Sequence, residues 1–162
     1  MTNEEYLLDW HKNHIWARPK PSNICDGIGM FAIQDIPKYT NIYESADRNV
    51  SGWVSWEKVK ELPEQIVKWL IDYQPHIGSK MIDLSSSFDW DSDCGDVYLY
   101  TSEGFNFRKF HWSIMWFFQN HSDDHNIDVK GGRDYKFISN RDIKEGEELF
   151  DNYNLSITAY DQ

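Results

Sequence analysis

The sequence FFQNHSDDHN, residues 117–126, contains two histidines four positions apart among asparagines and aspartates. On a helix, this spacing directs two imidazoles toward one metal ion. The glutamate that a zinc protease needs directly after the first histidine is replaced by Ser122. Asparagine, serine and paired aspartates are also poor residues for a helix interior. A metal-dependent hydrolase on His121 and His125 stays open only if both histidines and an aspartate converge from a loop.

A second near match is GIGMFA, residues 27–32, which fits the glycine spacing of dinucleotide-binding loops. That pattern binds a pyrophosphate only when a strand precedes it and a helix follows it. Here the β-favouring stretch MFAIQDI (residues 30–36) and Pro37 follow instead. The sequence argues against a Rossmann site, and the glycines mark a place where backbone can approach a ligand closely.

The acidic stretch DWDSDCGD, residues 89–96, begins like a calcium-binding loop, with aspartates at alternate positions. The sixth position of such a loop needs glycine and is Cys94, and the twelfth needs a bidentate glutamate and is Tyr100. We interpret the stretch as a solvated acidic loop that helps to attract a basic substrate.

Hydrophobic periodicity predicts a helix in PEQIVKWLIDY (residues 63–73), where apolar residues recur at positions i, i+3, i+4 and i+7 behind a proline. MFAIQDI and DVYLY (residues 96–100) have the composition of strands. RPKPSN (residues 18–23) has the prolines of an extended connector. Many short strands with one or two helices predict a mostly β, α+β domain.

The glycine pair at residues 131–132 predicts a hairpin. A two-residue turn would set apolar residues opposite polar ones. One more loop residue pairs Val129 with Tyr135 and keeps one apolar face. We therefore predict a three-residue loop or a bulge there.

Composition limits the class of protein. The 162 residues carry 27 acidic and 16 basic side chains, a formal net charge of −11, which repels nucleic-acid phosphates and anionic membranes and attracts basic partners. No window reaches the ~18 apolar residues of a membrane span, and the first residues are acidic. We expect a soluble intracellular protein, cytoplasmic or, if its target is chromatin, nuclear, without direct nucleic-acid or membrane binding. Cys25 and Cys94 lack the CxxC spacing of a thiolate zinc site, and we expect two reduced thiols.

Three stretches together, in the order GIGMFAIQDI, FFQNHSDDHN and NRDIKEGEELFDNY (residues 140–153), resemble the SET-domain family of protein lysine methyltransferases. Each has a family counterpart: a glycine loop opening into a strand, an NHS motif with an asparagine four residues after its serine, and a late RDIxxGEEL leading into a tyrosine. The resemblance implies several small twisted sheets with a threaded, pseudoknot-like C-terminal segment, an exception to the rule against knotted chains. It implies one SET domain over residues 1–162, with a core at 24–154, a divergent insertion at 46–96 and a tail at 155–162.

The resemblance also implies that the opening cluster binds S-adenosylmethionine and no metal. By family position, Asn120 binds the amino acid end of the cofactor, and His121 offers main-chain hydrogen bonds to its adenine. The glycine loop meets the cofactor through the backbone of four residues: Asp26, Gly27, Ile28 and Gly29. Tyr98 matches a further cofactor contact, with a core aromatic as the alternative.

The implied reaction transfers a methyl group to a lysine amine in a basic protein or peptide, histone-like or ribosomal, and the negative net charge fits such a target. A lysine has a pKa of ~10.4, so its amine must lose a proton before it attacks the sulfonium methyl in line. By family position, Tyr153 is the catalytic tyrosine that orients the amine. Four aromatic residues are candidates for the lysine channel, with core packing as the alternative: Tyr100, Trp112, Trp116 and Phe118.

The chain departs from the family pattern at several positions. Asp123 replaces the usual cysteine after NHS, His125 the usual proline, and Phe117 the usual arginine. Asp151 stands two residues before the catalytic tyrosine, where relatives often carry Phe or Tyr to limit the number of methyl groups. No cysteine cluster flanks the motifs, which implies a minimal form without zinc-bound modules. These departures keep a catalytically inactive, SET-like protein-interaction module open as the alternative, and the methyl number and oligomeric state open as well.

Overall fold

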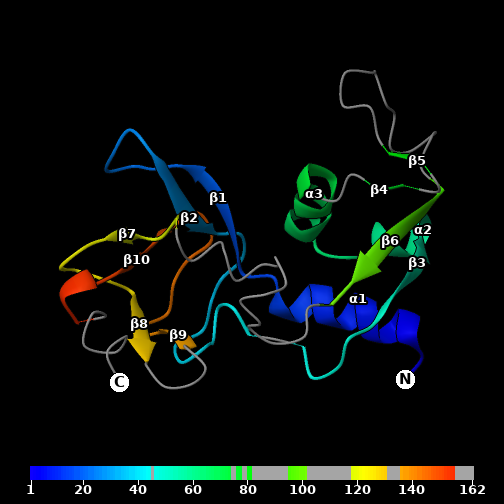
Figure 1. Ribbon diagram of the computed structural model, residues 1–162, viewed down its shortest axis with the longest axis horizontal. Helices are drawn as coiled ribbons and strands as arrows, with labels where there is room; N and C mark the ends of the chain where they lie inside the picture. Colours follow the sequence, from blue (N-terminus) through cyan, green and yellow to red (C-terminus); the bar gives the residue numbers. More distant parts are fainter. Residues whose placement is uncertain are drawn as a thin grey trace. The chain divides into compact units, whose positions relative to one another are not determined.

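The computed structural model describes residues 1–44, 46–73, 76–77, 80–81, 95–101, 118–130 and 136–155. At residues 73, 76–77, 80–81 and 100 the backbone alone is described. The chain divides into two compact units, each built from two separated segments (Figure 1). Unit 1 comprises Met1–Asn13 and Ala46–Glu103, and unit 2 comprises His14–Ser45 and Gly104–Gln162.

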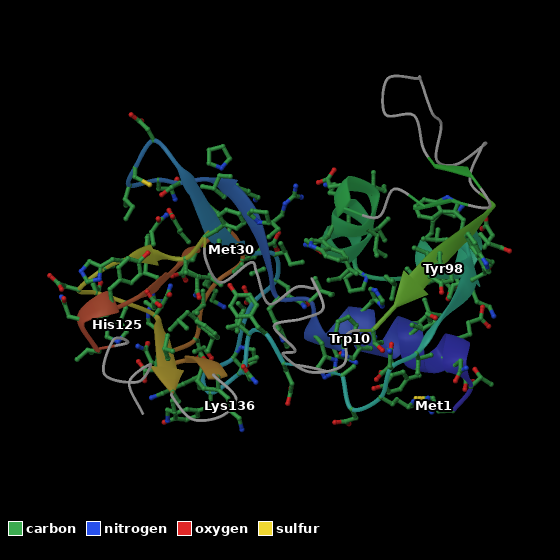
Figure 2. All side chains as sticks on the ribbon, in the orientation of Figure 1. Met1, Trp10, Met30, Tyr98, His125 and Lys136 are labelled. Carbon is green, nitrogen blue, oxygen red and sulfur yellow. The ribbon has the colours of Figure 1, made fainter. Side chains whose placement is uncertain are left out.

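Unit 1 begins with helix α1 (Asn3–His14), which was not among the elements predicted from the sequence. The helix starts at a reciprocal cap. The Thr2 hydroxyl accepts a hydrogen bond from the Glu5 amide (3.1 Å), and the Glu5 carboxylate accepts one from the Thr2 amide (2.6 Å). The side chains that the helix buries are Leu7, Trp10 and His11, of which Trp10 is labelled in Figure 2.

The rest of unit 1 is a four-stranded antiparallel sheet with two helices. The strand order is β3-β6-β4-β5. The strands are β3 (Ser51–Ser55), β4 (His76–Ile77), β5 (Lys80–Met81) and β6 (Asp96–Tyr100). Helix α2 (Trp56–Val59) follows β3, and α3 (Glu64–Tyr73) buries its apolar face, Ile66, Trp69 and Leu70. The predicted helix and the predicted strand DVYLY are confirmed.

Unit 2 contains the sheet that positions the candidate site, with strand order β1-β2-β10-β7. Its strands are β1 (Ala17–Pro21), β2 (Ile28–Ala32), β7 (Asn120–His121) and β10 (Glu148–Asp151). β10 pairs antiparallel with β2 and parallel with β7, so a late strand lies between two earlier ones (Figure 1). This insertion is the threaded C-terminal segment expected of the fold.

A second, two-stranded antiparallel sheet in unit 2 joins β8 (Ile127–Lys130) to β9 (Lys136–Ser139). Val129 pairs with Phe137 and not with Tyr135, so the predicted register is wrong by two residues. A shift of two residues keeps the same side chains on the same face. The apolar face therefore survives, and Phe137 joins the buried core that contains Met30 (Figure 2).

The stretch RPKPSN forms most of β1 and is not a connector, which corrects the prediction. Its prolines fit because β1 is an edge strand, where one row of amides needs no partner. MFAIQDI is a strand only as far as Ala32. No helix follows the glycine loop in the described residues 33–44, in agreement with the rejected Rossmann site. The acidic stretch at 89–94 lies outside the described residues, and none of the described helices is long and apolar enough to cross a bilayer.

Candidate cofactor site and active site

Asn120 lies on β7 beside β10, and its side-chain amide is held by three acceptors. Its Nδ2 lies 3.1 Å from the Ser22 hydroxyl, 3.1 Å from the Ile28 carbonyl and 3.0 Å from the Glu148 carboxylate. Because an amide nitrogen only donates, these contacts orient the Asn120 side chain with its nitrogen toward the protein. The carbonyl oxygen Oδ1 is the end left to a ligand.

Glu148, the first residue of β10, organises this network and was not among the predicted site residues. Its carboxylate accepts hydrogen bonds from the Ser22 hydroxyl (2.7 Å) and the Asn23 amide (2.8 Å), and the residue is 4% exposed. A Cβ on Gly29 would come within 2.0 Å of Glu148 Oε1, so the carboxylate fits only beside glycine. The sequence signal for it was the second glutamate of GEEL, an acidic residue at the start of an apolar strand.

The loop at residues 23–28 is exposed and carries three of the predicted cofactor residues, Asp26, Gly27 and Ile28. A hydrogen bond from the Ser22 amide to the Gly27 carbonyl (2.9 Å) closes this loop. Gly29, the fourth predicted residue, is buried at its base. Cys25, in the same loop, is a free and exposed cysteine. The structure therefore brings the predicted glycine loop to the Asn120 side chain.

His121 and Tyr153 are also brought together. The His121 Nδ1 accepts a hydrogen bond from the Tyr153 amide (3.1 Å), and the two rings lie 5.2 Å apart. The Tyr153 hydroxyl donates to the Gln119 carbonyl (2.6 Å), one residue before Asn120. Since this hydrogen bond uses the only hydroxyl proton, the phenol oxygen faces other ligands as an acceptor. Burial, and then the nearby charges of Asp151 and Cys25, raise the pKa of Tyr153 above its ordinary value.

Asn126, the asparagine four residues after the serine of NHS, fastens β10 in place. Its Nδ2 donates to the Glu148 carbonyl (2.9 Å), and its Oδ1 accepts from the Phe150 amide (2.8 Å). The residue is 1% exposed. One side chain thus satisfies two backbone groups of the inserted strand, which explains why the fold needs an asparagine here.

Asp151 is a buried carboxylate at the end of β10. It is 4% exposed, and its Oδ1 has no hydrogen-bond partner in the described part of the chain. Burial raises the pKa of Asp151 to about 6, although His121 and His125 act to lower it. Burial and the charge of Asp151 also raise the pKa of Tyr43, whose buried hydroxyl is likewise unpartnered among the described residues.

The other predicted site residues are placed less favourably or not described. Tyr98 lies on β6 of unit 1, where its ring packs against Trp53 with centroids 5.0 Å apart, so its cofactor role stays a prediction. Phe118 is partly exposed just before β7. Trp112, Trp116 and the side chain of Tyr100 lie outside the described residues.

The histidine pair does not form a helical metal site. His121 is on β7, whereas His125 follows a turn and its Nε2 lies 3.1 Å from Asp128 Oδ1. Across the described ranges, no three His, Cys, Asp or Glu side chains are grouped to hold a metal ion.

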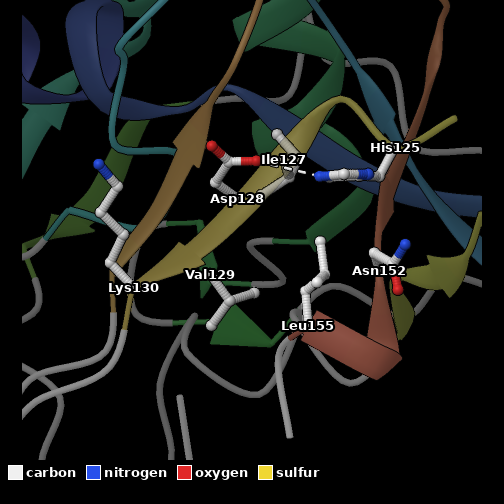
Figure 3. A pocket seen from close by; sticks show the side chains of 7 residues that line it. All are labelled: His125, Ile127, Asp128, Val129, Lys130, Asn152 and Leu155. Atoms are coloured by element: carbon white, nitrogen blue, oxygen red, sulfur yellow. Dashed lines mark hydrogen bonds and ion pairs between the residues drawn. The ribbon is translucent and has the colours of Figure 1, made fainter. Parts of the chain in front are cut away.

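A cavity of about 250 Å³ is lined in part by Asn152 and Leu155, which lie on either side of Tyr153 in the sequence (Figure 3). It is lined by His125, Ile127, Asp128, Val129, Lys130, Asn152 and Leu155. Its volume is below the ~300–1,000 Å³ of typical small-molecule sites, so it is large enough for only part of a ligand.

Comparison with protein families decides the identity of the fold. The family model of the SET domain matches residues 27–154, which include the glycine loop, Asn120, His121 and Tyr153. The chain belongs to the SET-domain family. The small sheets and the inserted β10 of this SET domain agree with that assignment, which confirms the resemblance seen in the sequence.

Solved structures with this fold are only distantly similar. One is an active Polycomb repressive complex 2 in the stimulated state, with 20% identity and a TM-score of 0.40 over 85% of this chain and 15% of that chain. Another is a Plasmodium falciparum protein of proposed histone methyltransferase activity, with 16% identity and a TM-score of 0.35 over 85% of this chain and 92% of that chain. The SET-domain chain thus spans a small part of the Polycomb chain that it matches. No curated protein matches the sequence.

Proposed function

We propose that this SET-domain protein transfers a methyl group from S-adenosylmethionine to the side-chain amine of a lysine in a basic protein segment. The observation that carries the proposal is that Tyr153 hydrogen-bonds to both neighbours of Asn120, Gln119 and His121. The Tyr153 hydroxyl is bonded to the carbonyl of the residue directly before Asn120. This arrangement supports the proposal that Asn120 binds the cofactor and that the Tyr153 hydroxyl orients the amine close to it.

The residues around Asn120 suit the cofactor chemically. S-adenosylmethionine, when bound, supplies an electrophilic methyl group on a sulfonium, and it also carries an ammonium group. The site offers acceptors for these cations: Asn120 Oδ1 and the buried Glu148 carboxylate, which has only neutral donors among the described residues. A buried carboxylate without a cation is costly, so a cationic ligand compensates it. His121 and the loop from Asp26 to Gly29 would hold the remainder of the cofactor through backbone groups.

The Tyr153 hydroxyl would position the lysine amine. Because it donates its proton to the Gln119 carbonyl, its oxygen can accept a hydrogen bond from the amine N–H. This bond would point the nitrogen lone pair in a fixed direction for in-line attack. The raised pKa of Tyr153 keeps the hydroxyl protonated and neutral at physiological pH.

The net charge of −11 supports a basic target, since an acidic protein attracts and orients cationic segments. We propose a histone-like or ribosomal segment as the substrate class. The second candidate function is a protein-interaction module that has lost catalysis. The buried Asp151 near Tyr153 is the observation that favours it.

Calorimetry with S-adenosylmethionine tests the cofactor assignment. Asn120→Ala should weaken binding by roughly 1.5–3 kcal/mol, the value of a charge-assisted hydrogen bond. Asn13→Ala is the matched control, because Asn13 is exposed on α1 and bonds only Asp9 among the described side chains. Equal affinities for all three proteins would refute the assignment of Asn120.

A labelling assay with basic peptides and a histone mixture tests catalysis. Tyr153→Phe should retain cofactor affinity and lower the methylation rate at least tenfold, about 1.4 kcal/mol of transition-state stabilisation. Tyr39→Phe, which removes a hydroxyl from a side chain that is 74% exposed, should not change the rate. Equal rates for parent and Tyr153→Phe would remove Tyr153 from the mechanism. Cofactor binding without labelling of any substrate would favour the interaction module.

A further inference from the structure

Asp151 is the buried charged group that the proposed mechanism does not use. Its side chain is at the end of β10, two residues before Tyr153, and opposite His121 in the strand pairing. The residue is 4% exposed, and Oδ1 has no partner in the described part of the chain. Removing an ionised carboxylate from water costs several kcal/mol unless a partner compensates it. A cationic ligand at the candidate active site would compensate such a group.

The groups around Asp151 compensate its charge only in part. His121, His125 and a hydrogen bond from its own backbone act to lower its pKa, but burial outweighs them. Tyr43 and Tyr153 are the other groups with which it interacts electrostatically. The His121 Nδ1 is an acceptor for the Tyr153 amide, and the His125 Nε2 lies 3.1 Å from Asp128. The hydroxyl of Tyr43 is buried without a hydrogen bond to the described residues. Neither lysine nor arginine from the described ranges forms an ion pair with Asp151, which leaves its carboxylate open to a cationic ligand.

The position of Asp151 indicates which cation. Its charge reaches the Tyr153 hydroxyl, where the lysine amine is to be oriented. We propose that Asp151 is the amine-binding residue of this protein, and that its carboxylate captures the ε-ammonium of the incoming lysine beside the Tyr153 hydroxyl. This inference rests on the proposed function. Asp151 would thus bind the substrate from the position where relatives often carry Phe or Tyr.

The chemistry of a carboxylate predicts selectivity that an aromatic channel alone would lack. An ionised carboxylate accepts charge-assisted hydrogen bonds from N⁺–H groups, which an alcohol of the same length cannot supply with equal strength. Capture also depends on pH, because the protonated acid has no charge. The pKa of Asp151 is raised to about 6, so amine binding should be strong above that pH and weaken as the pH falls through it.

An NMR titration with n-butylammonium chloride tests the inference without a known target or turnover. The probe reproduces the end of a lysine side chain, and n-butanol is its uncharged control. Both are titrated at pH 8 into the full chain with isotopically labelled aspartate carboxyl groups. We expect butylammonium to bind more tightly than butanol, and Asp151→Asn to weaken it at least about tenfold, which is the loss of one charge-assisted hydrogen bond. Asp124→Asn removes the same charge from an exposed side chain and should bind butylammonium like the parent.

Three results would overturn the inference: no butylammonium binding to the parent, equal binding of butanol, or unchanged binding in Asp151→Asn. Unaltered affinity between pH 8 and pH 5 would also contradict it. Calorimetry with S-adenosylmethionine on the same samples separates this failure from that of the proposed function. Cofactor binding without selective amine binding removes Asp151 alone, whereas loss of both removes the proposed function as well.

Discussion

Unit 1 packs aliphatic and aromatic side chains around α3 and β6, whereas unit 2 also buries polar side chains close to its strands. Among the described residues, the buried polar groups of unit 1 are His11 and Thr101, and those of unit 2 are Gln119, Asn126, Ser139, Glu148 and Asp151. Thr101 is satisfied by the backbone at Val50 and Arg48. Ser139 of unit 2 is likewise satisfied by the backbone at Pro37 and Thr40. The other four polar groups of unit 2 lie on β10, precede β7 or bond the backbone of β10, next to the candidate site.

The two units differ in the kind of buried polar group that reduces their stability. His11 is kept neutral in an apolar core, since burial lowers its pKa to about 4. Both units bury polar atoms without partners among the described residues: His11 Nε2 in unit 1, and Asp151 Oδ1 and the Gln119 amide in unit 2. Unit 2 differs in that one of these groups, Asp151, is a carboxylate. A buried polar group without a hydrogen bond costs about 1–3 kcal/mol. Unit 2 therefore contains the residues whose replacement should separate folding from function.

The largest effect on stability is expected for Asn126→Ala. The change leaves the Glu148 carbonyl and the Phe150 amide buried without their side-chain partner, which should cost about 2–5 kcal/mol of unfolding free energy. Urea unfolding followed by circular dichroism measures this loss. Asn13→Ala, on the exposed face of α1, should change it by less than about 0.5 kcal/mol. Similar midpoints for the two variants would mean that β10 does not depend on Asn126.

Asp151→Asn should remove the buried carboxylate of unit 2 that lacks a full set of partners, a kind of group that the described residues of unit 1 do not bury. The folded-state pKa is raised to about 6 from an ordinary value of 3.8, so the protonated acid is favoured in the folded protein. The resulting stability is fully present below about pH 4 and is lost as the pH rises through 6, a loss of about 3 kcal/mol for two pKa units. The asparagine variant lacks this loss. It should be more stable than the parent at pH 7.5 and show little difference at pH 4.

Thermal unfolding of both proteins across this pH range provides the measurement. If Asp151→Asn is less stable than the parent at pH 7.5, then the carboxylate already has a partner in the folded protein. That result would also remove the basis for its role in amine binding.

Gly29→Ala should damage the site with a smaller loss of stability. The new Cβ would displace the Glu148 carboxylate from the Ser22 hydroxyl, the Asn23 amide and the Asn120 amide, at a cost of about 2 kcal/mol. Cofactor affinity measured by calorimetry should fall with it. Gly95→Ala in unit 1 is the matched control, because its Cβ meets nothing within 4 Å. Unchanged cofactor affinity in Gly29→Ala would show that Glu148 is not needed to shape the site.

The smallest effect is expected at the start of α1. Thr2→Ala removes the acceptor for the Glu5 amide and should reduce the unfolding free energy by about 1 kcal/mol, while cofactor affinity stays the same. Thr2→Ser keeps the hydroxyl and should restore stability. A loss of cofactor affinity in Thr2→Ala would contradict the assignment of the cofactor site to unit 2.

Much of the fold was predictable because its motifs carry their own physical requirements. The glycine loop, the NHS stretch and the late tyrosine stretch identified the family, and the periodicity of residues 63–73 predicted α3. Helix α1 was missed although its capping box, Thr2 with Glu5, is visible in the sequence. The acidic and polar residues of this segment hide the short apolar face that the helix buries, Leu7 and Trp10.

The remainder depends on partners distant in the chain. RPKPSN is a strand because β2 pairs with it, and prolines alone do not show whether a partner exists. The register of β8 with β9 places Phe137 opposite Val129 and in the buried core, whereas local pairing of apolar residues predicted the right face at the wrong position. Glu148 became recognisable as a site residue only when β10 was placed beside Gly29.

The position of β10 between β2 and β7 also has a consequence for synthesis of the chain. Ser22 and Glu148 meet across 126 positions of sequence, and a ribosome that adds ~5–20 residues per second needs on the order of 6–25 s to cover that interval. Throughout that time, the edge of β2 that β10 will occupy has no native neighbour on the nascent chain. An unpaired strand edge is a template for wrong pairing. The half-finished sheet is therefore exposed to wrong pairing during synthesis, and the candidate site is incomplete until β10 has left the ribosome.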